Sequence, residues 1–184
     1  MKQRLYKFIF YRILGWKLIG TVDASIKKCV FSVIPHTSNF DFFLGLFSRG
    51  IIDLEMNFVG KKELFVFPIG YYFKSVGGAP LDRSGGKNNV DATVAVFNSR
   101  EVFRLALSPE GTRRKVSQLR SGFYYIAHKA SVPIIPVAFD YSKKEVRLGS
   151  PFYTTGDYES DMNLFLPFFR EVVGKNKENG YQIK

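Results

Sequence analysis

Residues 29–41 read CVFSVIPHTSNFD and contain the clearest structural pattern of the chain. The run from Cys29 to Ile34 is apolar apart from one serine and rich in β-branched and aromatic side chains, which favours a strand. The next seven residues, PHTSNFD, are polar and begin with proline, so we expect a loop there. A short helix should follow and end before Gly50. A strand, a polar loop and a helix in this order are typical of an α/β layer.

The rest of the chain repeats this alternation. Further strands are expected at 57–59, 102–107, 132–139 and 146–148, with a short strand that runs into a glycine-rich loop within 77–86. Helices are expected at 61–74, 88–97, 118–130 and 159–173. The short turn at 142–145 predicts a hairpin between the last two strands. The expected fold class is therefore α/β: a single domain with a mixed, mostly parallel sheet flanked by helices and preceded by an N-terminal amphipathic helix.

Composition narrows the class of protein. The 184 residues suit one domain, and 27 Lys plus Arg against 16 acids give a formal net charge of +11. This charge favours an anionic partner, such as a membrane surface, nucleic acid or a phosphorylated substrate. One cysteine and two histidines exclude a disulfide framework and argue against a metal site.

The N-terminal segment has two open interpretations. Apolar side chains recur there at helical spacing, between basic residues: Leu5, Phe8, Ile9, Ile13 and Trp16. The segment is either a surface helix packed on the core or a helix lying in a membrane interface. We expect residues 1–24 to be a basic, membrane-associating helix and residues 25–184 to be the main domain. No run of about 20 apolar residues and no cleavable signal peptide is found.

Candidate sites are the polar loops that directly follow apolar strands, because α/β folds place ligands at the carboxyl ends of strands. The first loop carries His36 and Asp41. Histidine can accept a proton near neutral pH, and a carboxylate on its other nitrogen fixes the tautomer. The pair can meet if His36 ends the strand and Asp41 lies in the first helical turn. The alternative is that Ser38 and Asp41 only form a capping box.

Two further loops are rich in positive charge. Arg83 is followed by Ser-Gly-Gly-Lys, where arginine and glycine together suit a phosphate, although an ordinary surface turn has the same composition. The loop SPEGTRRK at 108–115 places one carboxylate beside several cations. It is either an ordered loop that presents positive charge or a helix-capping turn on a solvated face.

Taken together and in this order, the loops resemble those of the glycerolipid acyltransferase family, which includes 1-acylglycerol-3-phosphate acyltransferases. His36 and Asp41 match its histidine, four residues, aspartate motif, and Arg83 matches an arginine after a short apolar strand. Residues 110–113 match an E-G-T-R loop, and 132–137 match an apolar strand that contains proline. The similar region runs from about residue 30 to 140. Two positions depart from the common family pattern. Pro35 stands where asparagine commonly precedes the histidine, and Ser108 stands where phenylalanine often precedes the proline before the E-G-T-R loop.

The resemblance implies a glycerol-3-phosphate acyltransferase-like fold and a role for each matching residue. His36 takes the proton of a lysolipid hydroxyl that attacks an acyl thioester, Asp41 orients His36, and no acyl-enzyme forms. The implied acceptor site consists of Arg83, Glu110, Gly111, Thr112, Arg113 and Arg120.

The expected function is acyl transfer from acyl-CoA or acyl carrier protein to a lysophospholipid, with 1-acylglycerol-3-phosphate as the leading acceptor and phosphatidate as the product. No metal and no further cofactor are expected. The expected location is the cytoplasmic face of the cell membrane, with peripheral attachment to an anionic surface. Acylation of another lysolipid, such as a lyso-amino-acid lipid, is one alternative. The others are non-catalytic binding to anionic membranes and binding to nucleic acid. The sequence has no RNP-like, helix-turn-helix or zinc motif that would support nucleic-acid binding.

Overall fold

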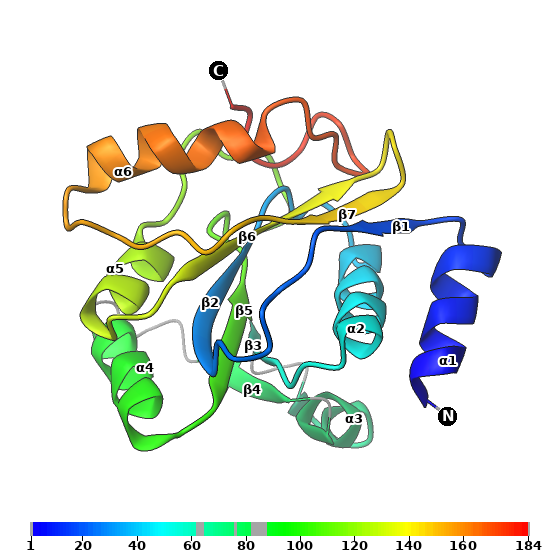
Figure 1. The fold of residues 1–184 in the computed structure, drawn as a ribbon, viewed down its shortest axis with the longest axis horizontal. Helices are drawn as coiled ribbons and strands as arrows, with labels where there is room; N and C mark the ends of the chain where they lie inside the picture. Colours follow the sequence, from blue (N-terminus) through cyan, green and yellow to red (C-terminus); the bar gives the residue numbers. More distant parts are fainter. Residues whose placement is uncertain (1, 62–64, 76, 82–87, 184) are drawn as a thin grey trace.

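A computed structural model describes residues 2–61, 65–75, 77–81 and 88–183. Its centre is a seven-stranded sheet in the order β1-β7-β6-β2-β5-β3-β4 (Figure 1). The strands are β1 (Lys17–Ile19), β2 (Lys28–Val33), β3 (Asn57–Lys61), β4 (Gly78–Leu81), β5 (Phe103–Leu107), β6 (Ile134–Asp140) and β7 (Glu145–Leu148). All neighbouring strands pair in parallel except β6 and β7, which form the expected antiparallel hairpin. The predicted mixed, mostly parallel sheet is confirmed.

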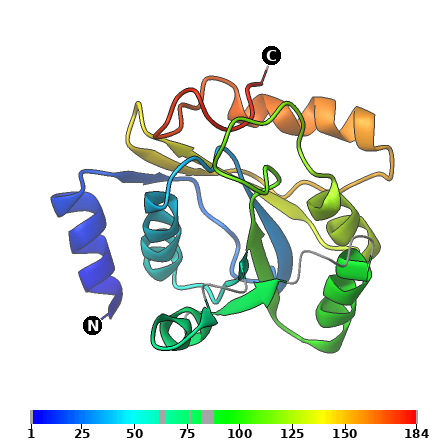
Figure 2. The ribbon, with the colours of Figure 1, turned by 180° about the vertical axis from the view of Figure 1, so that it is seen from behind.

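Helices cover both faces of this sheet. They are α1 (Lys2–Lys7), the π-helical turns η1 (Phe8–Ile13), α2 (Phe40–Ile52), α3 (Ile69–Ser75), α4 (Asn88–Ser99), α5 (Gly122–Lys129), α6 (Tyr158–Phe165) and the 3₁₀ helix η4 (Leu166–Phe169). Figures 1 and 2 show α4, α5 and α6 on one side of the sheet and α1 and α2 on the other. The domain therefore has three layers, helix, sheet and helix.

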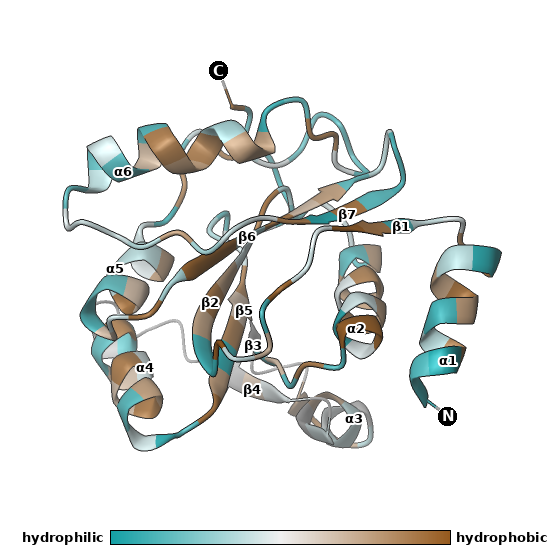
Figure 3. Ribbon diagram, in the orientation of Figure 1, coloured by the Kyte–Doolittle hydropathy of each residue, from teal (hydrophilic) through white to brown (hydrophobic). Residues whose placement is uncertain are grey.

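The core consists of two apolar clusters, one on each face of the sheet. Alternation along β2 divides its side chains between them: Val30 packs with α4, α5 and α6, whereas Cys29 and Phe31 pack with α2 and the N-terminal segment. Figure 3 shows the corresponding hydrophobic colouring along β2, β5 and β6. Burial raises the pKa of Cys29 to about 12, so its thiol stays protonated.

Three helices are shorter than the sequence pattern predicts. α3 begins only after Pro68, and α6 ends at Phe165 because Pro167 has no N–H to continue the helical ladder. α5 begins at Gly122, because the backbone N–H of Arg120 donates to the carbonyl oxygen of Pro109 at 2.8 Å and so belongs to a loop. No helix among the described residues is long and apolar enough to cross a membrane.

The N-terminal segment differs from the single helix expected over residues 1–24. Its helical turns end at Ile13, and β1 then joins the edge of the sheet beside β7. Phe10 is fully buried and Trp16 is 5% exposed, so Trp16 belongs to the core and not to an exposed apolar stripe. The prediction of Trp16 on the apolar face of a helix was wrong because Trp16 lies beyond the end of the helical turns, where helical spacing no longer sets the direction of its side chain. Other large apolar side chains of the segment stay exposed: Leu5, Phe8, Tyr11 and Ile13.

Candidate active site

The candidate site lies where three adjacent parallel strands end. β2 is central and pairs with β5 on one side and β6 on the other, so their carboxyl ends reach the same edge of the sheet. The loop after β2 carries His36, the loop after β5 carries residues 108–115, and Tyr141 follows β6. β4 ends at Leu81, but Arg83 lies outside the described residues.

His36 and Asp41 are in contact. The imidazole Nδ1 lies 3.1 Å from Oδ2 of Asp41, whose side chain is 1% exposed, whereas the His36 side chain is 25% exposed. A proton on Nδ1 that is shared with the carboxylate leaves Nε2 unprotonated. The pair thus presents an imidazole nitrogen that can accept a proton from a bound molecule.

The capping interpretation of the same loop is correct in part: the Asp41 half of the box forms, but the Ser38 hydroxyl does not bind the N–H of Asp41, and Asn39, at the N-cap of α2, forms no side-chain cap bond. Asp41 Oδ2 accepts hydrogen bonds from the backbone N–H groups of Thr37 and Ser38, both at 2.9 Å. Ser38 Oγ in turn accepts from the backbone N–H of Phe40 at 3.1 Å. The capping bonds fix the carboxylate at the start of α2, and this fixed position brings it within reach of His36. The two interpretations of the sequence are therefore one structure.

Tyr141 is a member of this cluster that the sequence did not reveal. Its hydroxyl donates to Asp41 Oδ1 at 2.5 Å, and its ring packs edge-on against Trp16 with 4.8 Å between centroids. Burial, followed by the bond to Asp41, raises the pKa of Tyr141 well above its usual value, so the hydroxyl stays protonated and can donate. Its place immediately after the apolar strand β6 was the one available signal.

Glu110 lies beneath the loops and does not line the open pocket. Its side chain is buried, Oε2 accepts from the backbone N–H of His36 at 2.6 Å, and Oε1 accepts from that of Tyr181 at 2.7 Å. Burial raises the pKa of Glu110, and the two N–H donors oppose this shift. In the structure this carboxylate holds the loop after β2 against the C-terminal segment.

The other residues of the E-G-T-R stretch turn outward. Gly111 has a φ of +63°, and a Cβ atom there would lie 2.6 Å from Nε of Arg120, so the position favours glycine. The hydroxyl of Thr112 accepts from the backbone N–H of Arg114 at 3.3 Å and orders the turn. The side chains of Arg113 and Arg120 are exposed.

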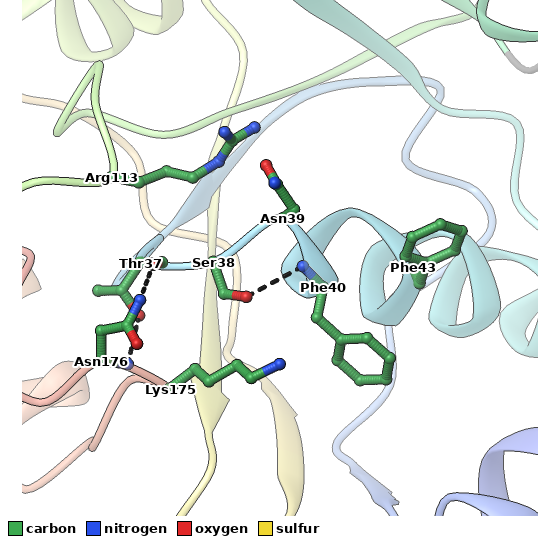
Figure 4. A pocket seen from close by; sticks show the side chains of 8 residues that line it. All are labelled: Thr37, Ser38, Asn39, Phe40, Phe43, Arg113, Lys175 and Asn176. Carbon is green, nitrogen blue, oxygen red and sulfur yellow. Dashed lines mark hydrogen bonds between the residues drawn. The ribbon is translucent and has the colours of Figure 1, made fainter.

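An open pocket of about 510 Å³ lies against residues 37–40, between His36 and Asp41 in the sequence, although neither of those two side chains lines it. It is lined by Thr37, Ser38, Asn39, Phe40, Phe43, Arg113, Lys175 and Asn176 (Figure 4). Arg113 comes from the predicted E-G-T-R loop, whereas Lys175 and Asn176 come from the polar C-terminal segment, which carried no motif. Among the described residues, no group of three or more His, Cys, Asp or Glu side chains is placed to hold a metal ion.

The profile of the Acyltransferase family matches residues 21–140. A chloroplastic 1-acyl-sn-glycerol-3-phosphate acyltransferase of Brassica napus is 29% identical over 154 residues, which cover 79% of this chain and 42% of that protein. A Salmonella typhimurium protein of the same activity is 29% identical over 122 residues, covering 63% and 49%. The chain thus spans less than half the length of these relatives.

A solved structure shares the fold. The crystal structure of the 1-acyl-sn-glycerophosphate (LPA) acyltransferase of Thermotoga maritima superposes with a TM-score of 0.57 at 18% identity. The similarity covers 90% of this chain and 73% of that one.

Removing the hydroxyl of Tyr141 should destabilise the fold. Tyr141→Phe leaves one oxygen of the buried Asp41 carboxylate without its donor, which should lower the free energy of unfolding by about 1.5–3 kcal/mol. Tyr153→Phe is the matched control, because Tyr153 is exposed and should tolerate the change. Urea denaturation of both variants measures the difference, and equal stability would show that the Tyr141 bond contributes nothing.

Proposed function

The chain belongs to the acyltransferase family, and we therefore propose that it transfers an acyl group from a thioester donor to the free hydroxyl of a lysophospholipid. The observation that carries this proposal is the His36–Asp41 contact at the carboxyl end of β2, within the part of the chain that matches the family. The proposed donor is acyl-CoA or acyl carrier protein. The proposed acceptor is 1-acylglycerol-3-phosphate, which would give phosphatidate, and the names of the relatives support it.

The proposed chemistry is a direct transfer with general base catalysis. Nε2 of His36 takes the proton from the acceptor hydroxyl while that oxygen forms a bond to the thioester carbonyl carbon. Asp41 stabilises the imidazolium that results. The tetrahedral intermediate then collapses, its C–S bond breaks, and the leaving thiolate takes the proton back from Nε2. No covalent acyl-enzyme is needed, and the chain's own residues supply every proton transfer.

Positive side chains at the same edge of the sheet support an acidic acceptor. Arg113 lines the pocket next to the pair, and Arg120 follows the same loop. We assign Arg83 to the acceptor phosphate on the sequence match and on its place two residues after β4. Arginine can make two charge-assisted bonds to one phosphate group.

Attachment to an anionic membrane surface is also proposed, without a spanning helix. The exposed side chains of Leu5, Phe8 and Ile13 lie on the N-terminal helical turns, where basic residues alternate with them. Such a helix can bury its apolar side chains at the headgroup level while its cations contact anionic lipid. We place this surface on the cytoplasmic side of the cell membrane, where soluble acyl donors are made available.

The base is tested by substitution of His36. His36→Ala should lower turnover with lysophosphatidate and acyl-CoA or acyl carrier protein by about 10²–10⁴-fold, the usual contribution of a general base. Asp41→Asn should lose a similar amount or less. His128→Ala is the control, since His128 lies exposed on α5 against Thr154. Mass spectrometry of the lipid product measures all three, and near-normal turnover of His36→Ala would refute the proposed mechanism.

The acceptor is tested at Arg83. Arg83→Lys should weaken kcat/KM for lysophosphatidate, and Arg83→Ala should weaken it further, because lysine lacks the planar fork of arginine. A phosphate-free lysolipid with the same acyl chain should be affected much less. Loss of the same size for both acceptors would contradict the assignment of Arg83 to phosphate and would favour another acceptor, such as a lyso-amino-acid lipid.

Membrane attachment is tested with two neighbouring phenylalanines of opposite exposure. Phe8 is 56% exposed, so Phe8→Ala should reduce cosedimentation with anionic vesicles. The same substitution should leave the free energy of unfolding within about 0.5 kcal/mol of that of the parent protein. Phe10 is fully buried, so Phe10→Ala should lower the free energy of unfolding by about 3–5 kcal/mol. If Phe8→Ala bound vesicles like the parent protein, this face would not be the membrane contact.

A further inference from the structure

The C-terminal segment, residues 174–183, is bound to the loop after β2. The backbone N–H of Asn176 donates to Thr37 Oγ1 at 3.2 Å, and its side-chain amide donates to the Thr37 carbonyl oxygen at 2.7 Å. The backbone N–H of Tyr181 bonds to Glu110. Figure 4 shows Asn176 joined to Thr37 by both bonds. The segment is thus fixed near one end to Thr37, the residue next to His36, and near the other to Glu110, which also accepts from the backbone N–H of His36.

Two glycines let this segment approach closely. A Cβ atom on Gly174 would lie 2.7 Å from Thr37 Oγ1, and one on Gly180 would lie 2.8 Å from Glu110 Oε1. Gly180 also has a φ of +82°, which a residue with a side chain rarely adopts. The backbone of Lys175, between Gly174 and Asn176, is therefore held at one position in the site.

Lys175 brings a second cation into the pocket. Figure 4 shows Lys175 and Arg113 on opposite sides of residues 37–39, both extending toward the start of α2. Lys175 Nζ lies 5.0 Å from the ring centroid of Phe40, so that ring faces the ammonium group. The residues that line the pocket include no acid, and neither cation forms an ion pair within the described ranges. Two cations that line one pocket without an acidic side chain beside them favour an anionic ligand.

We propose that Lys175 of the C-terminal segment and Arg113 of the loop after β5, which both line the pocket, together bind a phosphate group of a substrate. The proposal deepens the proposed function and rests on it for the identity of the substrate. The phosphate belongs either to the headgroup of the lysolipid or to the acyl donor, and both have the same charge chemistry. Lys175 is then a specificity-determining residue that lies outside the region matched by the family.

The test measures binding and not turnover. The full chain with His36→Ala serves as the parent, so no acyl transfer disturbs the measurement. Dissociation constants are measured for short-chain lysophosphatidate and its monoacylglycerol counterpart, and for CoA and pantetheine. Lys175→Met removes the charge and keeps the length of the side chain, and Lys175→Arg keeps the charge. Lys177→Met is the matched control, because it changes the net charge equally on the same segment but lies outside this pocket.

Lys175→Met should raise the dissociation constant of one phosphate-bearing ligand by about 10-fold, the effect of one charge-assisted bond at a partly solvated site. The dissociation constant of the phosphate-free counterpart should change much less in Lys175→Met. The dissociation constant of the phosphate-bearing ligand should also change much less in Lys175→Arg and Lys177→Met. The ligand that responds, lysophosphatidate or CoA, identifies the source of the phosphate.

Three results would overturn the inference: equal losses for a ligand and its phosphate-free counterpart, equal losses for Lys175→Met and Lys177→Met, or no preference of the parent protein for either phosphate. Unfolding measurements on each variant exclude loss of the fold as the cause. Acyl transfer by the unmodified chain is assayed separately, so failure of the proposed function and failure of this site give different results.

Discussion

Two buried carboxylates hold the loop on which the whole site depends. The backbone N–H of His36 donates to Glu110, and the next two, of Thr37 and Ser38, donate to Asp41. Three consecutive peptide groups are thus bound by side chains at a point where the sheet ladder has ended. A buried backbone N–H without a partner is costly, so these acceptors decide the path of the loop. The path in turn decides where the imidazole of His36 lies.

The strand order makes this arrangement possible. Asp41 comes from the helix that follows β2, but Glu110 comes from the loop after β5 and Tyr141 from the end of β6. Because β5 and β6 are the two parallel neighbours of β2, their loops reach the same edge and close on the central loop from both sides. The site is therefore a property of the sheet and not of one segment.

The residues of the E-G-T-R stretch have two kinds of position: some hold the backbone of the loops in place, and one faces the pocket. Glu110 points inward and binds backbone, the left-handed turn at Gly111 reverses the chain, and Arg113 faces the pocket. A similar division applies to the N-terminal segment, in which Trp16 packs on Tyr141 while the neighbouring helical turns expose apolar side chains. The segment proposed to meet lipid is thus linked, through the packing of Trp16 on Tyr141 and the hydrogen bond of Tyr141, to Asp41, which contacts His36.

Local apolar runs and turn residues were enough to predict the α/β class and the hairpin of β6 and β7. The short spacing of His36 and Asp41 allowed their contact but left a capping role open, and the structure showed that they meet. The sequence did not determine β1, the burial of Trp16, or the placing of Tyr141, Asn176 and Lys175 beside the site. Those residues meet their partners across about a hundred positions or more of the chain, and no local pattern records such a partner. Only the order of the strands and the path of the C-terminal segment brought them together, because burial and hydrogen bonding are satisfied between segments and not within one.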